Sequence, residues 1–142
     1  EPMPEVYPRS IPTEPGAWSF SPEPDVVVIN LGTNDFSTDG DPTETQFVTT
    51  YVAFLELLRS RYPDALVMCT VAPLLSGDDE MRAVAYVQSA VSQRNTAGDD
   101  DVIWIDLRVE PVGWGCDWHP SVATHEAMAE KLIASLEAEL GW

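Results

Sequence analysis

Cysteine, histidine and lysine are scarce in this chain of 142 residues, and no long hydrophobic run is present. Its two cysteines, Cys69 and Cys116, are too few for a disulfide-rich scaffold or a metal knuckle. They leave open one disulfide bond or two ordinary thiols. The longest apolar run, residues 26–31, has the length of a strand and cannot span a bilayer. The composition therefore excludes a disulfide scaffold and a helical membrane protein.

Basic side chains are also few, because seven lysines and arginines face 24 aspartates and glutamates, for a formal net charge of −17. Such a negative field repels phosphate backbones and anionic lipid surfaces. We therefore expect neither a nucleic-acid nor a membrane partner. We interpret the charge as an adaptation for solubility or salt tolerance rather than as a site for a basic partner.

The start of the chain shows no charged segment followed by an apolar stretch, so we expect no signal peptide within it. Because the first residue is Glu1 and not Met, we expect a processed or truncated chain. Seven of the twelve prolines lie in residues 1–24, which excludes a central strand or a long helix there. We assign residues 1–24 as an extended connecting segment, held by Tyr7, Trp18 and Phe20, and residues 25–142 as the folded part.

Three apolar runs, at residues 25–32, 65–72 and 102–107, predict three β-strands. They do not alternate with polar residues, which is typical of strands buried on both faces of a parallel sheet. A helix follows each strand. The first begins with Asp41 as N-cap and Pro42 as first helical residue, the second begins near Ser76, and the third runs from Ser121 to about Leu140.

Apolar residues at helical spacing predict the buried face of each helix. They are Phe47, Tyr51, Phe54, Leu55 and Leu58 in the first helix, Met81, Val84, Val87, Gln88 and Val91 in the second, and Met128, Leu132, Ile133, Leu136 and Leu140 in the third. The alternation of strands and helices predicts an α/β fold with a parallel sheet sandwiched between helices. Because three strands make a narrow sheet, we expect one or two more from another segment or a partner chain.

The loops after the strands carry the polar groups of interest, since ligands of open α/β sheets bind beyond the carboxyl ends of the strands. Residues 32–41, 73–78 and 108–120 occupy this edge. Asn34 is suited to stabilise an oxyanion, because its amide donates hydrogen bonds without losing a proton, and Gly32 permits a close backbone approach. The alternative is a simple turn in which Asn34 and Asp35 cap backbone groups. On these residues alone the turn is the better interpretation.

His119 is suited to act as a general base on a serine hydroxyl, because the pKa of imidazole lies near neutral pH. The alternative is an exposed loop histidine without a role. Asp117 is a candidate to orient the ring, whereas we interpret His125 as a packing or capping residue. An Asp-x-His sequence with a second histidine also raises a metal site, but neither a third ligand nor a zinc-type spacing accompanies it, so no metal is expected. Trp114 and Trp118 flank His119, and they suit either a sugar ring or packing within the loop.

These two clusters resemble blocks of the SGNH (GDSL-type) hydrolases. Residues 27–35, with the sequence Val-Val-Ile-Asn-Leu-Gly-Thr-Asn-Asp, resemble the third block, whose Asn supplies an oxyanion donor. Residues 117–121, with the sequence Asp-Trp-His-Pro-Ser, resemble the fifth block, which holds the catalytic His. Residues 69–77 and 115–121 are similar to carbohydrate esterase family 2, the acetyl-xylan esterases.

The chain departs from the family at two points. The Gly-Asp-Ser block that carries the nucleophile has no counterpart, so the resemblance covers the C-terminal part of the catalytic domain. It places the nucleophilic serine on an upstream segment or a companion chain. Cys116 also stands three residues before His119, where the family usually has Asp. A Ser–His dyad with backbone support is tolerated in family 2.

The resemblance implies a three-layer α/β/α fold of the flavodoxin-like SGNH type and a carbohydrate O-acetyl esterase without a cofactor. His119 would move the proton and Asn34 would hold the oxyanion, with Asp117 as a further catalytic candidate. The substrate, an acetylated polysaccharide such as xylan, would contact Gly32, Asp35, Trp114 and Trp118. A polymeric substrate implies an extracellular protein, in which a Cys69–Cys116 disulfide would be compatible. The alternatives are a non-catalytic carbohydrate-binding remnant, or a lipase or other esterase of the same superfamily, which the lack of an apolar lid disfavours.

Overall fold

The computed structural model describes residues 1–14, 16–37 and 40–141. Pro15 of the proline-rich segment and residues 38 and 39 of the 32–41 loop lie outside the described residues. The elements in chain order are α1 (Met3–Val6), β1 (Val26–Asn30), α2 (Thr33–Phe36), α3 (Glu44–Arg61), β2 (Leu66–Thr70), α4 (Gly77–Thr96), β3 (Val102–Trp104), the 3-10 turn η1 (Cys116–Trp118) and α5 (Val122–Leu140).

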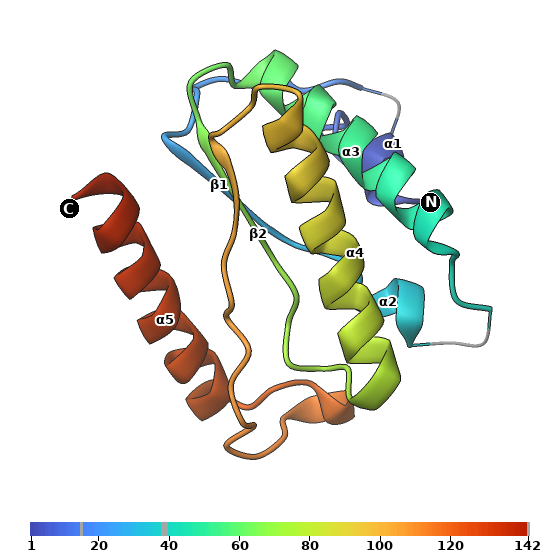
Figure 1. Cartoon of the computed structure of the whole chain (residues 1–142), viewed down its shortest axis with the longest axis vertical. Helices are drawn as coiled ribbons and strands as arrows, with labels where there is room; N and C mark the ends of the chain where they lie inside the picture. The colour runs from blue at the N-terminus through green and yellow to red at the C-terminus, as the bar shows by residue number, and fades with distance from the viewer. Residues whose placement is uncertain (15, 38–39, 142) are drawn as a thin grey trace.

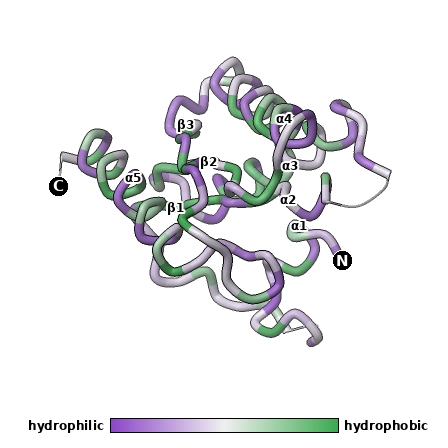
Figure 2. The backbone as a smooth tube through the Cα atoms, turned by 90° about the horizontal axis from the view of Figure 1, so that it is seen from below, coloured by the Kyte–Doolittle hydropathy of each residue, from purple (hydrophilic) through white to green (hydrophobic). Residues whose placement is uncertain are grey.

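The three strands form a parallel sheet in the order β1-β2-β3, as the alternation of strands and helices predicts. Val67 of the central strand lies opposite Val27 on one side and Val102 on the other. Helices α3 and α4 lie on one side of the strands and α5 on the other (Figure 1). The same three layers are visible when the molecule is seen from below (Figure 2). The predicted α/β fold is confirmed.

Each face of the sheet has its own core, because successive side chains of a strand point to opposite faces. The core under α3 and α4 includes Ile29, Phe47, Phe54, Leu55, Leu58, Val67, Cys69, Val87, Ala90 and Val102. The core under α5 is smaller and contains Met68, Ala72, Ile105, Leu107 and Met128, with Leu132 and Leu136 partly buried against it.

Burial on both faces is confirmed for β2 and wrong for β1. Residues 67–70 of β2 are all buried. In β1, by contrast, Val28 is 41% exposed and Asn30 is also exposed. These two side chains point to the α5 face, and the core under α5 is built on β2 and on residues 103–107. Among the described residues, no strand pairs with the outer edge of β1.

The first long helix starts two residues later than predicted. Thr43 is the N-cap of α3, and Gln46 completes a capping box. The Gln46 amide N–H donates to Thr43 Oγ1 at 3.3 Å, and the Thr43 N–H donates to Gln46 Oε1 at 3.0 Å. The predicted N-cap, Asp41, instead forms an ion pair with Arg82 at 2.6 Å. The reciprocal bonds of Thr43 and Gln46 satisfy two backbone donors, which decides where the helix begins.

The predicted buried faces are right for α3 and partly wrong for α4 and α5. All five predicted residues of α3 are buried. In α4, Met81 is 62% exposed and Gln88 is exposed, while Ala83 and Ala90 are fully buried. In α5, Ile133 is 53% exposed. The small alanine side chains let α4 lie close to its neighbours, so α4 buries a face that a search for large apolar residues misses.

The proline-rich segment is held against α3 by aromatic side chains, as predicted. Tyr7 packs edge-on against Phe54 with ring centroids 5.4 Å apart, and its hydroxyl donates to the Tyr62 hydroxyl at 3.1 Å. Phe20 packs on Trp18 with centroids 5.0 Å apart. Among the described residues of this segment, the one helix is α1, a short turn with proline in its first positions, where the missing N–H costs no helical bond.

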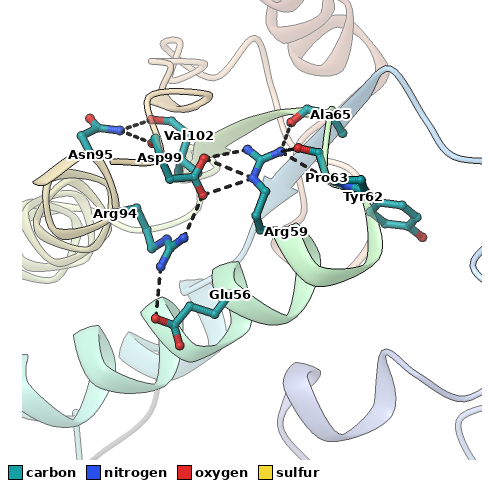
Figure 3. A network of polar contacts seen from close by, with 9 residues as sticks. All are labelled: Glu56, Arg59, Tyr62, Pro63, Ala65, Arg94, Asn95, Asp99 and Val102. Atoms are coloured by element: carbon teal, nitrogen blue, oxygen red, sulfur yellow. Dashed lines mark hydrogen bonds and ion pairs between the residues drawn. The ribbon is translucent and has the colours of Figure 1, made fainter. Parts of the chain in front are cut away.

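A polar network joins the C-terminal ends of α3 and α4 to the start of β2 and β3 (Figure 3). Arg59 of α3 binds Asp99 through Nε and Nη2, with the Nη2–Oδ1 distance at 2.9 Å. Its Nη1 donates to the Ala65 carbonyl at 2.8 Å and also to the Tyr62 and Pro63 carbonyls. Arg94 of α4 binds the other oxygen of Asp99 at 3.0 Å. One carboxylate thus holds both helix ends.

Loss of this carboxylate is expected to destabilise the fold. The side chains of Asp99, Arg59 and Arg94 are only 9%, 18% and 14% exposed. An Asp99→Asn substitution removes the carboxylate that pairs with Arg59 and leaves Arg94 with Glu56 alone as a charged partner, which costs about 2–3 kcal/mol of the free energy of unfolding. Urea unfolding followed by circular dichroism measures this loss. The control is Asp100→Asn at the exposed neighbouring position, where a change below about 0.5 kcal/mol is expected.

A comparison of wild type with Asp99→Asn also tests how the free energy of unfolding depends on pH. Burial alone raises the pKa of Asp99, but the hydrogen bonds and charges of Arg59 and Arg94 outweigh it and hold the pKa below its ordinary value. A lowered pKa in the folded state means that the stabilisation is fully present above about pH 4 and disappears as the pH falls through the folded pKa. The unfolding free energies of wild type and Asp99→Asn should therefore converge in acid. Parallel curves down to about pH 2 would contradict this role of Asp99.

Candidate active site

The first polar cluster follows β1 at its carboxyl end. Gly32 has φ of +118°, and a Cβ there would lie 3.3 Å from the Phe47 ring. Only glycine combines this left-handed backbone with so close a neighbour. The turn at Gly32 directs the chain into α2, where Asn34 and Asp35 are exposed. The strand end and its glycine thus present both polar side chains at the surface.

Helix α2 is anchored by the aromatic packing of Phe36 and by an ion pair between Arg82 and Asp41 in the loop that follows the helix. Phe36 is 2% exposed and lies 5.6 Å from the Phe47 ring and 5.7 Å from the Tyr86 ring, centroid to centroid. The Arg82 guanidinium sits 5.8 Å from the Phe36 centroid and binds Asp41 of the following loop. Phe36 and Arg82 therefore hold the segment that carries Asn34 against α4.

A cavity of about 850 Å³ opens beside this cluster. Its lining includes Gly32, Asn34 and Asp35 together with residues of the N-terminal segment and of α3, namely Glu1, Met3, Gln46, Phe47, Thr50, Tyr51 and Phe54. Asp35 is exposed as a residue, but partial burial of its carboxyl group raises its pKa above the ordinary value. Three of the predicted site residues thus share one cavity.

The second cluster is a short ribbon that carries His119. Trp114 pairs with Pro120 in antiparallel fashion. The Gly115 N–H donates to the His119 carbonyl at 2.7 Å. At its tip Asp117 and Trp118 have φ of 57° and 60°, and the His119 N–H donates to the Cys116 carbonyl at 3.2 Å. Two successive positive φ angles with this bond are typical of a type I′ turn.

The base of the ribbon is fixed by hydroxyl groups of the first turn of α5. Thr124 is fully buried, and its Oγ1 accepts from the Val112 N–H at 2.9 Å. Ser121 caps α5 by accepting from the Thr124 N–H, and its hydroxyl donates to the Val112 carbonyl at 3.0 Å. These bonds hold the backbone on both sides of His119.

The His119 ring is oriented by a main-chain group. Its Nδ1 lies 3.0 Å from the carbonyl oxygen of Asp117. A carbonyl oxygen can only accept a hydrogen bond, so Nδ1 carries the proton and Nε2 remains an acceptor in the neutral ring. The contact of Asp117 with the imidazole runs through its backbone. Whether its carboxylate also takes part in catalysis stays a prediction. His125, interpreted as a packing or capping residue, is exposed in the first turns of α5, so it does not pack in the core.

The two tryptophans that flank His119 occupy different surroundings. Trp118 stands at the tip of the ribbon and is 77% exposed. Trp114 is 50% exposed and lines a second cavity of about 830 Å³. This cavity is bordered by Pro73, Leu74, Leu75, Ser76, Glu80, Asp106, Arg108, Val109, Glu110, Pro111 and Lys131. Sequence reasoning missed its charged residues, although Arg108 follows β3 at the predicted edge and Lys131 is the single lysine of the chain.

The two clusters therefore share an edge of the sheet but not a cavity. Asn34 follows β1 and His119 lies in the connection between β3 and α5, so both stand beyond carboxyl ends of parallel strands. Gly32, Asn34 and Asp35 line the first cavity and Trp114 the second, whereas Asp117, Trp118 and His119 line neither. The described residues bring the polar groups to one edge without closing a single pocket around them.

The cysteines are separate in the fold. Cys69 is buried in the core under α3 and α4, Cys116 is exposed in the His119 ribbon, and both are free thiols. Burial raises the pKa of the Cys69 thiol to about 12. Within the described ranges, no three His, Cys, Asp or Glu side chains group closely enough to hold a metal ion. No helix in that part of the chain has the length and apolarity needed to cross a membrane.

Comparison with known families matches residues 8–127 to the GDSL-like Lipase/Acylhydrolase family. Among curated relatives, the chain is 43% identical over 139 residues to the cellulase/esterase CelE of Acetivibrio thermocellus. The match covers 96% of this chain and 17% of the relative. The chain is also 30% identical over 120 residues to an acetylxylan esterase/glucomannan deacetylase of Cellvibrio japonicus. That match covers 84% of this chain and 32% of the relative.

Solved structures show the same likeness. A family two carbohydrate esterase from Clostridium thermocellum, determined in complex with cellohexaose, superposes with a TM-score of 0.91 at 43% identity. The match covers 96% of this chain and 43% of that structure. A family two esterase with a carbohydrate-binding domain from Corynascus thermopiles gives a TM-score of 0.86 at 31% identity over 100% of this chain and 46% of that structure. The chain thus spans less than half of these relatives.

The strained turn at the tip of the ribbon yields a stability prediction. A left-handed φ costs a non-glycine residue about 1 kcal/mol, and Trp118 is too exposed to recover this by packing. Trp118→Gly should therefore raise the free energy of unfolding by about 1 kcal/mol. The matched control Trp118→Ala removes the same ring but keeps a Cβ, and it should show no such gain. If urea unfolding shows the same change in the free energy of unfolding for Trp118→Gly and Trp118→Ala, the backbone at Trp118 is not strained.

Proposed function

The chain belongs to the GDSL-like lipase/acylhydrolase family, and from this premise we propose that it forms the His-and-Asn half of a carbohydrate O-acetyl esterase site. In this proposal His119 is the general base and Asn34 an oxyanion donor. The serine nucleophile is supplied by an upstream segment or by a companion chain. The substrate is an acetylated polysaccharide such as xylan.

The observation that carries the proposal is the contact between His119 Nδ1 and the Asp117 carbonyl. A general base in this chemistry needs one ring nitrogen protonated and held, so that the other can take the proton from the serine hydroxyl. The main-chain carbonyl provides that fixation without an acidic side chain. A Ser–His dyad of this kind tolerates Cys116 at the position where an aspartate is usual.

Asn34 supports the proposal through its position. Its amide is exposed at the carboxyl end of β1, on a helical turn whose entry is fixed by Gly32 and whose exit is fixed by Phe36. A donor that does not move when charge develops is the requirement for oxyanion stabilisation. An acyl carbon attacked between Asn34 and His119 would place its developing O⁻ toward this amide.

The substrate class rests on the relatives. The matched curated relatives are a cellulase/esterase and an acetylxylan esterase/glucomannan deacetylase, and the Clostridium thermocellum structure holds cellohexaose. The exposed rings of Trp118 and Trp114 suit sugar faces on this chain. We extend the proposal to an extracellular location, because polymeric plant polysaccharides lie outside the cell.

A second candidate is a carbohydrate-binding remnant without catalysis. The observation that favours it is the exposure of Trp118, 77%, next to a histidine that lines neither of the two cavities. Labelling with a fluorophosphonate separates the two functions, because it marks only activated serines. The esterase proposal requires that the chain alone remains unlabelled and that label appears on the added segment when the site is complete.

The test of His119 uses a chimera. Fusing this chain to the part of the Clostridium thermocellum esterase outside the matched region supplies the missing nucleophile. We expect hydrolysis of 4-nitrophenyl acetate and of acetylated xylan, and a loss of about 10³-fold or more in kcat in His119→Ala. The control His125→Ala, at the second and exposed histidine, should stay within about twofold. Retained activity in His119→Ala would rule out the assignment, and no activity in a well-folded chimera would favour the binding remnant.

In the same chimera Asn34→Ala tests the oxyanion role. Removing one oxyanion donor is expected to lower kcat by about 10²–10³-fold with little change in KM, because the bond forms in the transition state. The control is Thr50→Ala, which lines the same cavity from α3 and bonds only to the Gln46 carbonyl of its own helix. A change in KM alone for Asn34→Ala would indicate substrate binding instead.

A further inference from the structure

The cavity of about 830 Å³ is lined by Trp114, whereas His119 is not among its lining residues. Trp114 is paired with Pro120, so its side chain and that of Pro120 share one face of the ribbon. The proposed catalytic residues use nothing of this cavity, and its lining comes from the ends of β2 and β3 and from α4 and α5.

The charged groups of this cavity largely neutralise one another. Arg108 binds Asp106 through two parallel bonds, Nε–Oδ1 and Nη2–Oδ2, each 2.8 Å long. Its Nη1 reaches Glu80 at 3.2 Å. Lys131 donates to the main-chain carbonyl of Arg108. The bonds from Arg108 lower the pKa of Asp106, so both groups stay charged at neutral pH.

These groups nevertheless keep room for a ligand. The side chains of Arg108, Asp106 and Glu80 are 31%, 46% and 28% exposed. A carboxylate has about four acceptor sites, and the bonds to Arg108 fill only part of them. Hydroxyl groups, which both donate and accept, match such a surface well. The half-exposed ring of Trp114 adds an apolar face at the rim.

We propose that this cavity is a second carbohydrate subsite, which binds an uncharged sugar unit through Trp114 and the Glu80–Arg108–Asp106 group. It rests on the proposed function in one respect, since it gives the polysaccharide backbone a place on this chain in a cavity that His119 does not line. Its volume lies within the range of about 300–1,000 Å³ that is usual for small-molecule sites.

The selectivity for uncharged sugars follows from the charges. Three carboxylates, on Glu80, Asp106 and Glu110, border the cavity against the two cations Arg108 and Lys131. The chain as a whole carries a net charge of −17. An anionic uronic acid unit would meet a guanidinium already occupied by carboxylates and an unfavourable field. Neutral backbones are therefore accepted and polyuronates rejected.

Binding to the 142-residue chain tests the proposal without any need for catalysis. Isothermal titration and ¹⁵N-resolved NMR would use xylohexaose and cellohexaose as neutral probes and hexagalacturonate as the anionic probe. We expect a neutral hexamer to shift the Trp114 indole signal and the backbone signals of residues 106–111, and hexagalacturonate to bind at least tenfold more weakly. Shifts at Trp118 alone, no binding, or equal binding of the anionic probe would overturn the proposal.

Variants locate the site independently. Trp114→Ala should raise Kd at least tenfold and Glu80→Gln several-fold, while Glu130→Gln, on the exposed surface of α5 next to Lys131, should leave Kd unchanged. If Trp118→Ala abolishes binding and Trp114→Ala does not, the sugar binds at the His119 face and the proposal is wrong. A chimera that hydrolyses no ester but binds as expected would refute the esterase function and leave this subsite standing.

Discussion

Parallel pairing of both neighbours onto β2 is the constraint on which the rest of the structure depends. Residues 67–70 of β2 are buried on both faces, so the strand is built mainly from apolar side chains and needs helices on either side. Parallel strands also end at the same edge. The segments after β1, β2 and β3 are therefore brought together, although they are far apart in the sequence, and both polar clusters arise from them.

The scarcity of cations gives each arginine a structural task. Arg59 and Arg94 share Asp99 and fix the ends of two helices at the amino edge of the sheet (Figure 3). Arg82 and Arg108 lie at the opposite edge, where Arg82 holds the segment after α2 through Asp41 and Arg108 lines the second cavity. In a chain with a net charge of −17, these pairs place positive charge only where a defined contact needs it.

The two halves of the candidate site differ in how they are built. Asn34 depends on packing, because a buried phenylalanine and a left-handed glycine fix the turn that carries it. His119 depends on backbone hydrogen bonds, because Thr124, Ser121 and the Asp117 carbonyl fix the ribbon and the ring. The exposed side of β1, with Val28 at its centre, is the part of the fold that the described residues leave uncovered.

The sequence by itself determined the order of elements, the parallel α/β fold and the two polar clusters, because strand periodicity, helix caps and turn glycines act over a few residues. It placed Gly32, Asn34, Asp35 and His119 in the segments that follow strands at one edge of the sheet, although Asn34 and Asp35 lie in the short helix α2 rather than in a loop. Only the tertiary structure decided which helix face is buried, as Ala83 and Ala90 show against Met81, and which partner Asp41 takes. It also decided that Trp114 joins Arg108 in a second cavity, since such contacts depend on packing between residues distant in sequence.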